Sequence, residues 1–205
     1  MVASAGCLAL AAGPAAAAPA PATVAPQARK DDGLAPIAVD ALQDLQTYMR
    51  TGDSGTLNRY KATRDSIANE AAARLGLDPA AMRSAWDEAD LPHQMALMAA
   101  FTQLGVPYRH NTSKAGIGFD CSGLTTYAWS VAGVTLTRQS AAQIRAASPR
   151  TLDTAMAGDL IYYPGHVMLY LGIDKAIVHA PYTGTAVQFD VVNKRRSVRL
   201  GDPTA

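Results

Sequence analysis

The stretch GHVMLYLGIDKAIVHA at residues 165–180 decides the fold, because it reads as two strands joined by a polar turn. Side chains alternate in character on both sides of Asp174, which is typical of a β-hairpin. A turn of even length places His166 and His179 diagonally on one face, since side chains along a strand alternate with a period of two. The opposite face is apolar and belongs to the core. The two imidazoles are therefore predicted to lie within reach of each other.

A second segment, FDCSGL at residues 119–124, opens an apolar-faced helix that Gly133 ends. Asp120 is a good N-cap, which makes Cys121 the first helical residue. Unpaired backbone N–H groups and the helix dipole favour a thiolate at this position, although the charge of Asp120 opposes the effect. A reactive Cys121 therefore still needs a base. A buried structural thiol is the alternative interpretation.

The region before the cysteine has a helical pattern of apolar residues from Ile37 to about Leu104. One helix is predicted at Thr56–Leu75, and prolines at positions 79 and 92 mark two further helix starts. After Gly105 the sequence changes to glycine-punctuated loops, one helix and short strands. The chain is therefore predicted to be an α+β protein with an antiparallel sheet, preceded by a small helical region. This region is interpreted as a packing subdomain, and the alternatives are that it positions a substrate, contacts a partner or covers a cleft.

The first twenty residues, MVASAGCLALAAGPAAAAPA, form an apolar stretch that ends in small residues of the kind a signal peptidase cuts. The stretch lacks a basic residue, which points to a signal that begins further upstream. Internal Gly and Pro make it a poor membrane-spanning helix, so stable membrane insertion is not expected. A secreted protein is predicted, located in the cell wall or outside the cell. Lipid modification of Cys7 is the minor alternative.

Export would remove Cys7 and leave Cys121 as the only cysteine in an oxidising compartment. An unpaired cysteine there suggests a reactive thiol or an intermolecular bond. The formal net charge of +1 gives no support for nucleic-acid binding. Zinc is not expected, although imidazole and thiolate both bind it, because no CxxC or HxxxH pair occurs. No metal and no cofactor is predicted.

Five segments in a fixed order resemble the NlpC-type cell-wall endopeptidases. They are LGVPYRHNTSKAGIGFDCSGLTTYAW (104–129), TRQSAAQ (137–143), AGDLIYY (157–163), GHVMLYLG (165–172) and IVHAPYTG (177–184). The resemblance implies a circularly permuted papain-like fold, with the cysteine at a helix start and two histidines on successive antiparallel strands. It also implies a peptidoglycan stem peptide as substrate, often cleaved between γ-D-glutamate and meso-diaminopimelate.

The resemblance assigns roles to three residues of a thiol mechanism. Cys121 takes the position of the nucleophile in DCSGL, His166 that of the base in GHV, and His179 the third position. Non-catalytic peptidoglycan binding is one alternative, for which loss of the cysteine or of the base would be the signature. An exported toxin or acyltransferase on the same fold is the other.

Three more residues are carried over as oxyanion or substrate contacts. Tyr108, in the LGxPY motif, matches a tyrosine whose hydroxyl helps to bind the oxyanion, and an ordinary packed aromatic is the alternative. Asp120 and Ser122 match positions that line the substrate groove. The sequence departs from the family after Tyr108, where Arg109, His110 and Asn111 replace a Trp-Gly-Gly-like turn.

The chain is accordingly divided into a signal-peptide-like segment, a Pro/Ala-rich linker, a helical accessory region and an NlpC-type catalytic domain, at residues 1–20, 21–36, 37–91 and 92–205. A basic cluster near the C-terminus is interpreted as a solvated strand edge, with contact to anionic wall polymers as the alternative. Its members are Lys194, Arg195, Arg196 and Arg199.

Overall fold

The computed structural model describes Met1 and residues 32–204. The signal-peptide-like segment after Met1, Cys7 and most of the predicted linker lie outside the described residues. In the part of the chain that the structure describes, no helix has the length and apolar character needed to cross a membrane.

Four helices come first, α1 (Leu34–Thr51), α2 (Ser54–Leu75), α3 (Pro79–Glu88) and α4 (Leu91–Phe101). Aspartate N-caps start the last three, because each side chain accepts a hydrogen bond from a backbone N–H of the first turn. The predicted starts of α3 and α4 are confirmed, and α2 begins two residues earlier than predicted. α1 begins three residues before the predicted helical region, so the last residues assigned to the linker are helical.

The remaining described residues, up to residue 204, form two helices and eight strands. They are β1 (Ser113–Lys114), β2 (Gly118–Phe119), α5 (Cys121–Val131), α6 (Ser140–Ala146), β3 (Ser148–Arg150), β4 (Leu160–Tyr163), β5 (His166–Tyr170), β6 (Ala176–His179), β7 (Gln188–Val191) and β8 (Arg199–Asp202). β1 and β2 form a small ribbon, and the other six form an antiparallel sheet in the order β3-β8-β4-β5-β6-β7. Of the basic cluster only Arg199 lies in a strand, and this strand, β8, lies between β3 and β4, so the interpretation of the cluster as a strand edge is wrong.

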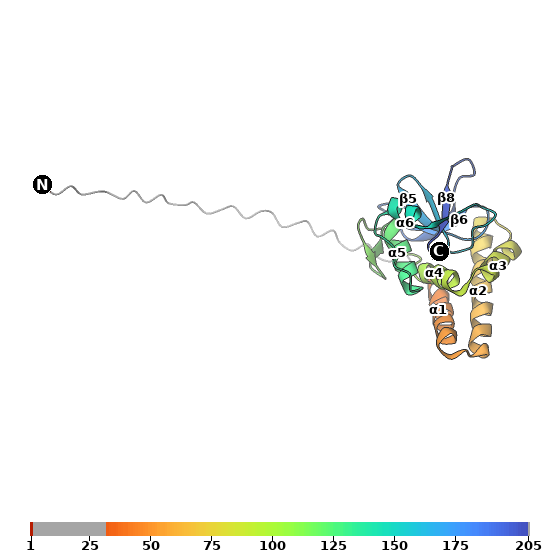
Figure 1. Ribbon diagram of the computed structural model, residues 1–205. Helices are drawn as coiled ribbons and strands as arrows, with labels where there is room; N and C mark the ends of the chain where they lie inside the picture. Colours follow the sequence, from red (N-terminus) through yellow and green to blue (C-terminus); the bar gives the residue numbers. More distant parts are fainter. Residues whose placement is uncertain (2–31, 205) are drawn as a thin grey trace.

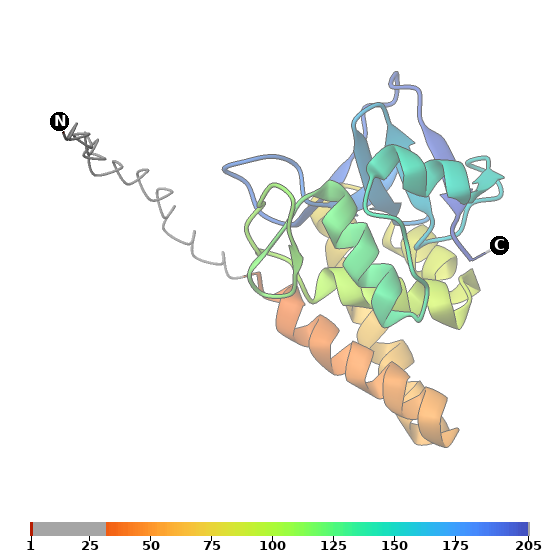
Figure 2. The same cartoon turned by 60° about the vertical axis from the view of Figure 1, so that its left-hand side comes forward.

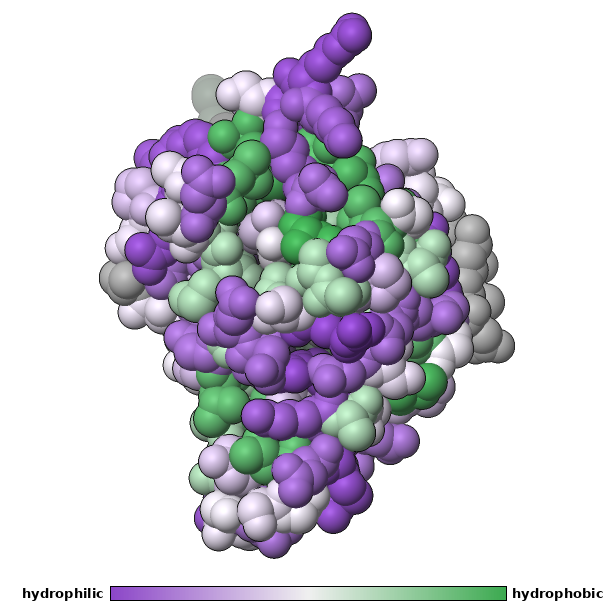
Figure 3. Space-filling model, turned by 90° about the vertical axis from the view of Figure 1, so that its right-hand side faces the viewer, coloured by the Kyte–Doolittle hydropathy of each residue, from purple (hydrophilic) through white to green (hydrophobic). Residues whose placement is uncertain are grey.

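The helices and the sheet form two layers around a common core. α1 and α2 run side by side as a hairpin that points away from the sheet (Figure 1). α5 packs against α4 and against β5, as the second view shows (Figure 2). On the side of the molecule shown in Figure 3, hydrophilic residues surround smaller hydrophobic patches. The predicted α+β class is confirmed, with its antiparallel sheet, its cysteine-headed helix and its preceding helical region.

The helical region and the sheet share one hydrophobic core. A single cluster of buried residues contains Leu45 of α1, Trp86 of α3 and Leu169 of β5. The indole N–H of Trp86 also donates a hydrogen bond to the carbonyl oxygen of Leu171, at 2.9 Å. Leu171 lies directly after the strand that carries His166. The helical region therefore packs against the histidine hairpin and stabilises its position.

Candidate active site

Cys121 is the first residue of α5, as predicted. The N-cap Asp120 is extended, with φ −92° and ψ 178°, and its Oδ1 accepts a 2.7 Å hydrogen bond from the backbone N–H of Gly123. A Cβ atom on Gly123 would lie 2.1 Å from the carbonyl oxygen of Thr112, so only glycine allows the helix to start this close to the neighbouring loop. The Cys121 thiol is free and partly exposed. This start leaves the sulfur accessible at the end of the helix dipole.

The two histidines come together as the alternation predicted. β5 pairs with β6 in a register that sets Leu169 opposite Val178, and four residues separate the paired Leu171 and Ala176. Nε2 of His166 lies 2.9 Å from Nδ1 of His179, and the rings meet edge to face at 75°. Both side chains are buried. The predicted contact between the two imidazoles is confirmed.

This contact decides which nitrogen of His166 is available for proton transfer. Nε2 is occupied by His179, whereas Nδ1 makes no hydrogen bond to any residue in the described range 32–204. A neutral His166 that donates its Nε2–H to His179 has an unshared electron pair on Nδ1. The arrangement can therefore accept a proton at Nδ1 while His179 holds the ring in that tautomer.

Burial keeps both imidazoles neutral. Loss of solvation lowers the pKa of His166 to about 4. Burial, with a smaller contribution from His166, lowers the pKa of His179 to about 3. A base must be unprotonated before it can act, and at neutral pH both rings meet this condition.

The low pKa of His166 predicts an unusually acid limb in the pH profile. If neutral His166 is the base, kcat/KM should stay high as the pH falls and be lost only near pH 4, instead of near the ordinary value of 6.5. The measurement is kcat/KM from neutral to acid pH, with circular dichroism at each pH to show that the protein stays folded. A limb centred near 6.5 would contradict the prediction.

Tyr108 lies beside the cysteine, where the resemblance places an oxyanion donor. Its backbone N–H donates to the carbonyl oxygen of Thr185, at 2.8 Å, which fixes the residue next to the loop after β6. Burial raises the pKa of Tyr108, and the nearby Cys121 and Asp120 raise it further. The hydroxyl is therefore protonated at neutral pH, and it makes no hydrogen bond within residues 32–204. It is available as a donor to a substrate.

Asp120 and Ser122 are held by an arginine for which the sequence motifs predicted no role. Arg138 donates to Oδ2 of Asp120 at 2.6 Å and to Oγ of Ser122 at 2.7 Å. Gln143 of α6 adds a 3.1 Å bond to the carbonyl oxygen of Ser122. Both residues come from the TRQSAAQ segment, which was the only signal that could have found them. A substrate contact by Asp120 or Ser122 stays a prediction, since both already have partners inside the protein.

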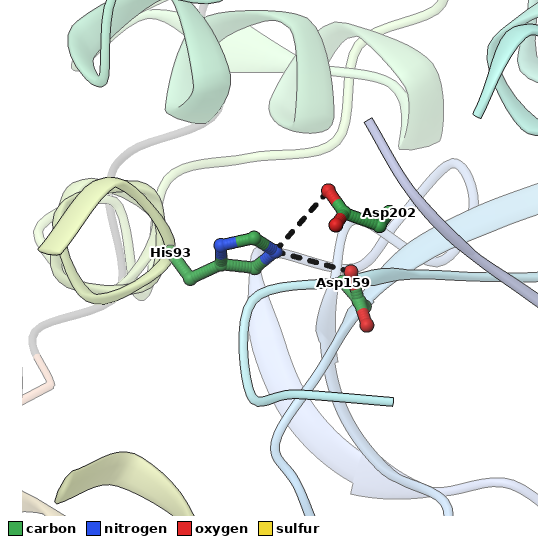
Figure 4. Close-up of side chains that lie close together, drawn as sticks. All are labelled: His93, Asp159 and Asp202. Carbon is green, nitrogen blue, oxygen red and sulfur yellow. Dashed lines mark hydrogen bonds and ion pairs between the residues drawn. The ribbon is translucent and has the colours of Figure 1, made fainter. Parts of the chain in front are cut away.

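A second cluster of titratable groups lies where α4 meets the sheet, and it consists of His93, Asp159 and Asp202 (Figure 4). Nε2 of His93, on α4, is 3.1 Å from Oδ1 of Asp159 and 3.5 Å from Oδ1 of Asp202. Nδ1 of the same ring is 2.7 Å from Asp90. The three atoms of His93, Asp159 and Asp202 that converge are within 4.8 Å of one another, so their donor set could hold a metal ion. A protonated imidazole also satisfies the carboxylates, with both ring N–H groups donating.

The contacts of His93 favour the protonated imidazole. Burial by itself would lower its pKa, but hydrogen bonds to Asp159 and Asp90 outweigh burial and raise it. Gly158 allows the close approach, because a Cβ atom there would lie 2.8 Å from the carbonyl oxygen of His93. The Gly-Asp pair of the AGDLIYY segment thus joins α4 to the sheet. We assign the cluster a structural role.

The raised pKa of His93 predicts that stability falls with rising pH. Charged His93 stabilises the fold fully below its ordinary pKa of 6.5, and this stabilisation is lost as the pH rises through the raised pKa of the folded state. His93→Gln should destabilise the protein by about 3 kcal/mol at neutral pH and remove much of this pH dependence. Thermal unfolding at several pH values measures both effects. The exposed His110→Gln is the control, and equal pH slopes in all three proteins would refute the role of His93.

Comparison with known proteins identifies relatives for the second half of the chain. Residues 105–199 match the model of the NlpC/P60 family. The chain is 35% identical over 109 residues to Dipeptidyl-peptidase 6 of Lysinibacillus sphaericus, covering 52% of this chain and 39% of the relative. It is 33% identical over 115 residues to Peptidoglycan endopeptidase RipA of Mycolicibacterium smegmatis, covering 48% of this chain and 23% of the relative.

Solved structures include a similar protein described as non-catalytic. The structure of RipD from Mycobacterium tuberculosis, titled a non-catalytic NlpC/p60 domain protein with adaptation to peptidoglycan binding, aligns with a TM-score of 0.45 and 26% identity. The alignment covers 55% of this chain and 98% of that chain. The chain spans well under two thirds of the length of both curated relatives described above.

Proposed function

Residues 105–199 are a domain of the NlpC/P60 family, and on that premise we propose that the protein is a cysteine peptidase that hydrolyses the stem peptide of peptidoglycan. One observation carries the proposal, the 2.9 Å contact between His166 and His179 on the sheet against which the Cys121 helix packs. This contact leaves one nitrogen of a neutral imidazole open for proton transfer. The name of the RipA relative, a peptidoglycan endopeptidase, supports the substrate class.

The proposed reaction is acyl transfer through a thioester. Nδ1 of His166 takes the thiol proton of Cys121, and the thiolate attacks the amide carbonyl carbon of the stem peptide. The backbone N–H of Cys121 and the hydroxyl of Tyr108 bind the oxygen of the tetrahedral intermediate. His166 then gives its proton to the leaving amine as the C–N bond breaks. Water hydrolyses the thioester, and His179 holds the working tautomer throughout.

The bond cleaved is proposed to be that between γ-D-glutamate and diaminopimelate, and the place of action the cell wall or the space outside the cell. The bond follows from the resemblance of the DCSGL, GHV and LGxPY segments, and the location from the apolar segment at residues 1–20. A wall-binding module without activity is the competing function. Retention of both Cys121 and His166 argues against it, because a module that only binds has no need of either group.

Mass spectrometry of digested muropeptides tests the proposed function. Soluble muropeptides of known structure are incubated with the protein, and the masses of the products identify the bond. New fragments that carry free diaminopimelate amines are expected. If muropeptides bind to the folded protein but are not cleaved, the binding module replaces the peptidase. If they neither bind nor are cleaved, the peptidoglycan assignment is wrong.

A further inference from the structure

An exposed arginine, Arg196, stacks on the tyrosine that neighbours the proposed base. Tyr163, the last residue of β4, pairs with His166, the first residue of β5, and the two rings lie 5.3 Å apart. The guanidinium of Arg196 covers the ring of Tyr163 with its carbon 4.4 Å from the ring centre. Arg196, Tyr163 and His166 therefore form a continuous row that leads from the protein surface to the base.

Hydrogen bonds hold the backbone of the loop that carries Arg196. Nζ of Lys175 donates to the carbonyl oxygens of Lys194 and Arg196, at 3.0 Å and 2.9 Å. The backbone N–H of Arg196 donates to the carbonyl oxygen of Asn193, at 2.9 Å. Stacking on Tyr163 holds the guanidinium in one place by cation–π attraction. The side chain is thus positioned before any ligand arrives, which lowers the entropy cost of binding.

The charge of Arg196 is available to a ligand. Arg138, by contrast, forms an ion pair with Asp120. Arg196 has no ion pair within the described residues 32–204, although it is exposed and stacked. A guanidinium offers two parallel N–H donors that match the two oxygens of a carboxylate. Its natural ligand is therefore a carboxylate that reaches this side of the site.

The chemistry of the reaction decides which part of the substrate lies there. The base protonates the leaving amine, so the residue released with that amine lies on the His166 side, whereas the acyl residue lies on the Cys121 side. We propose that Arg196 is a specificity-determining residue that binds a free carboxylate on the leaving-group residue. This inference rests on the proposed function. Diaminopimelate has such a carboxylate at the end of its side chain, and lysine lacks it.

Three stem peptides that differ only in the leaving-group residue test the assignment. This residue is diaminopimelate in the first, diaminopimelate with an amidated side-chain carboxylate in the second, and lysine in the third. The wild-type protein should prefer the free carboxylate. Arg196→Ala should lower kcat/KM on that peptide by about tenfold to a hundredfold, as expected for a lost charge-assisted hydrogen bond, and leave the lysine and amide peptides nearly unchanged. Arg196→Lys should keep part of the preference that Arg196→Ala loses, because lysine has the positive charge but lacks the two parallel N–H donors of the guanidinium.

Arg195→Ala is the matched control, since it removes the same charge from the adjacent exposed position of the loop. It should keep the wild-type preference. Equal loss on all three peptides in Arg196→Ala, an unchanged preference, or the same effect in Arg195→Ala would each overturn the assignment. A merely structural role of Arg196 would not distinguish between the peptides.

Binding to the Cys121→Ala protein separates this inference from the proposed function. Isothermal titration with the three peptides compares Cys121→Ala with the Cys121→Ala/Arg196→Ala double variant. The inference is supported, even if no peptide is cleaved, when Cys121→Ala binds the peptide with the free carboxylate more tightly than the other two and the double variant does not. If the wild type cleaves the peptides but Cys121→Ala binds all three equally well, the inference is overturned and the proposed function stands. No binding and no cleavage overturns both.

Discussion

Cys121→Ala is expected to reduce stem-peptide hydrolysis by about 10⁴-fold or more, the loss typical of removing a catalytic nucleophile. In the proposed mechanism the sulfur forms the thioester, and the structure offers no second thiol within the described residues 32–204. Activity that remained would have to come from binding and oxyanion contacts alone. Initial rates on a defined muropeptide measure the loss.

The Cys121→Ala protein should keep its fold, because the replaced side chain is small and partly exposed. Its melting temperature should stay close to that of the wild type, which separates a chemical loss from unfolding. Ser130→Ala is the matched control, as it removes an exposed hydroxyl from the same helix. Full hydrolysis by folded Cys121→Ala would falsify the assignment of Cys121 as nucleophile.

His166→Ala should lower activity by a factor similar to that of Cys121→Ala, since nucleophile and base act as a unit. Without the imidazole, nothing takes the proton from the thiol or returns it to the leaving amine. His179→Ala should have a smaller effect, because it leaves the base in place and removes only the group that orients it. Rates on the same muropeptide rank the three variants.

Exposed His110→Ala is the control for this series, because it deletes an imidazole outside the hairpin. A double variant lacking both Cys121 and His166 should be no slower than Cys121→Ala alone, as expected for residues that act together. A His166→Ala protein that loses less activity than His179→Ala would reverse the assigned roles. In that case His179 would be the base.

Local sequence patterns predicted most of what positions the three proposed catalytic residues. The alternation in residues 165–180 determined that His166 and His179 share a face, because a strand has a period of two whatever the rest of the chain does. Asp120 before Cys121 determined the start of α5, since a capping side chain acts on backbone groups two or three residues away. These interactions are short-ranged, so they can be read from neighbouring residues.

The tertiary structure alone decided the contacts between distant segments. His93 meets Asp159 across 66 positions of sequence, and Trp86 meets Leu171 across 85. Arg138 reaches Asp120 and Arg196 reaches Tyr163 in the same way, from other elements of the fold. The local pattern around an arginine is the same whether its charge is paired, stacked or free. The partner of an arginine is fixed only when packing brings two surfaces together. The sequence therefore determined the helix that begins at Cys121 and the pair of histidines, and the fold decided which residues surround them.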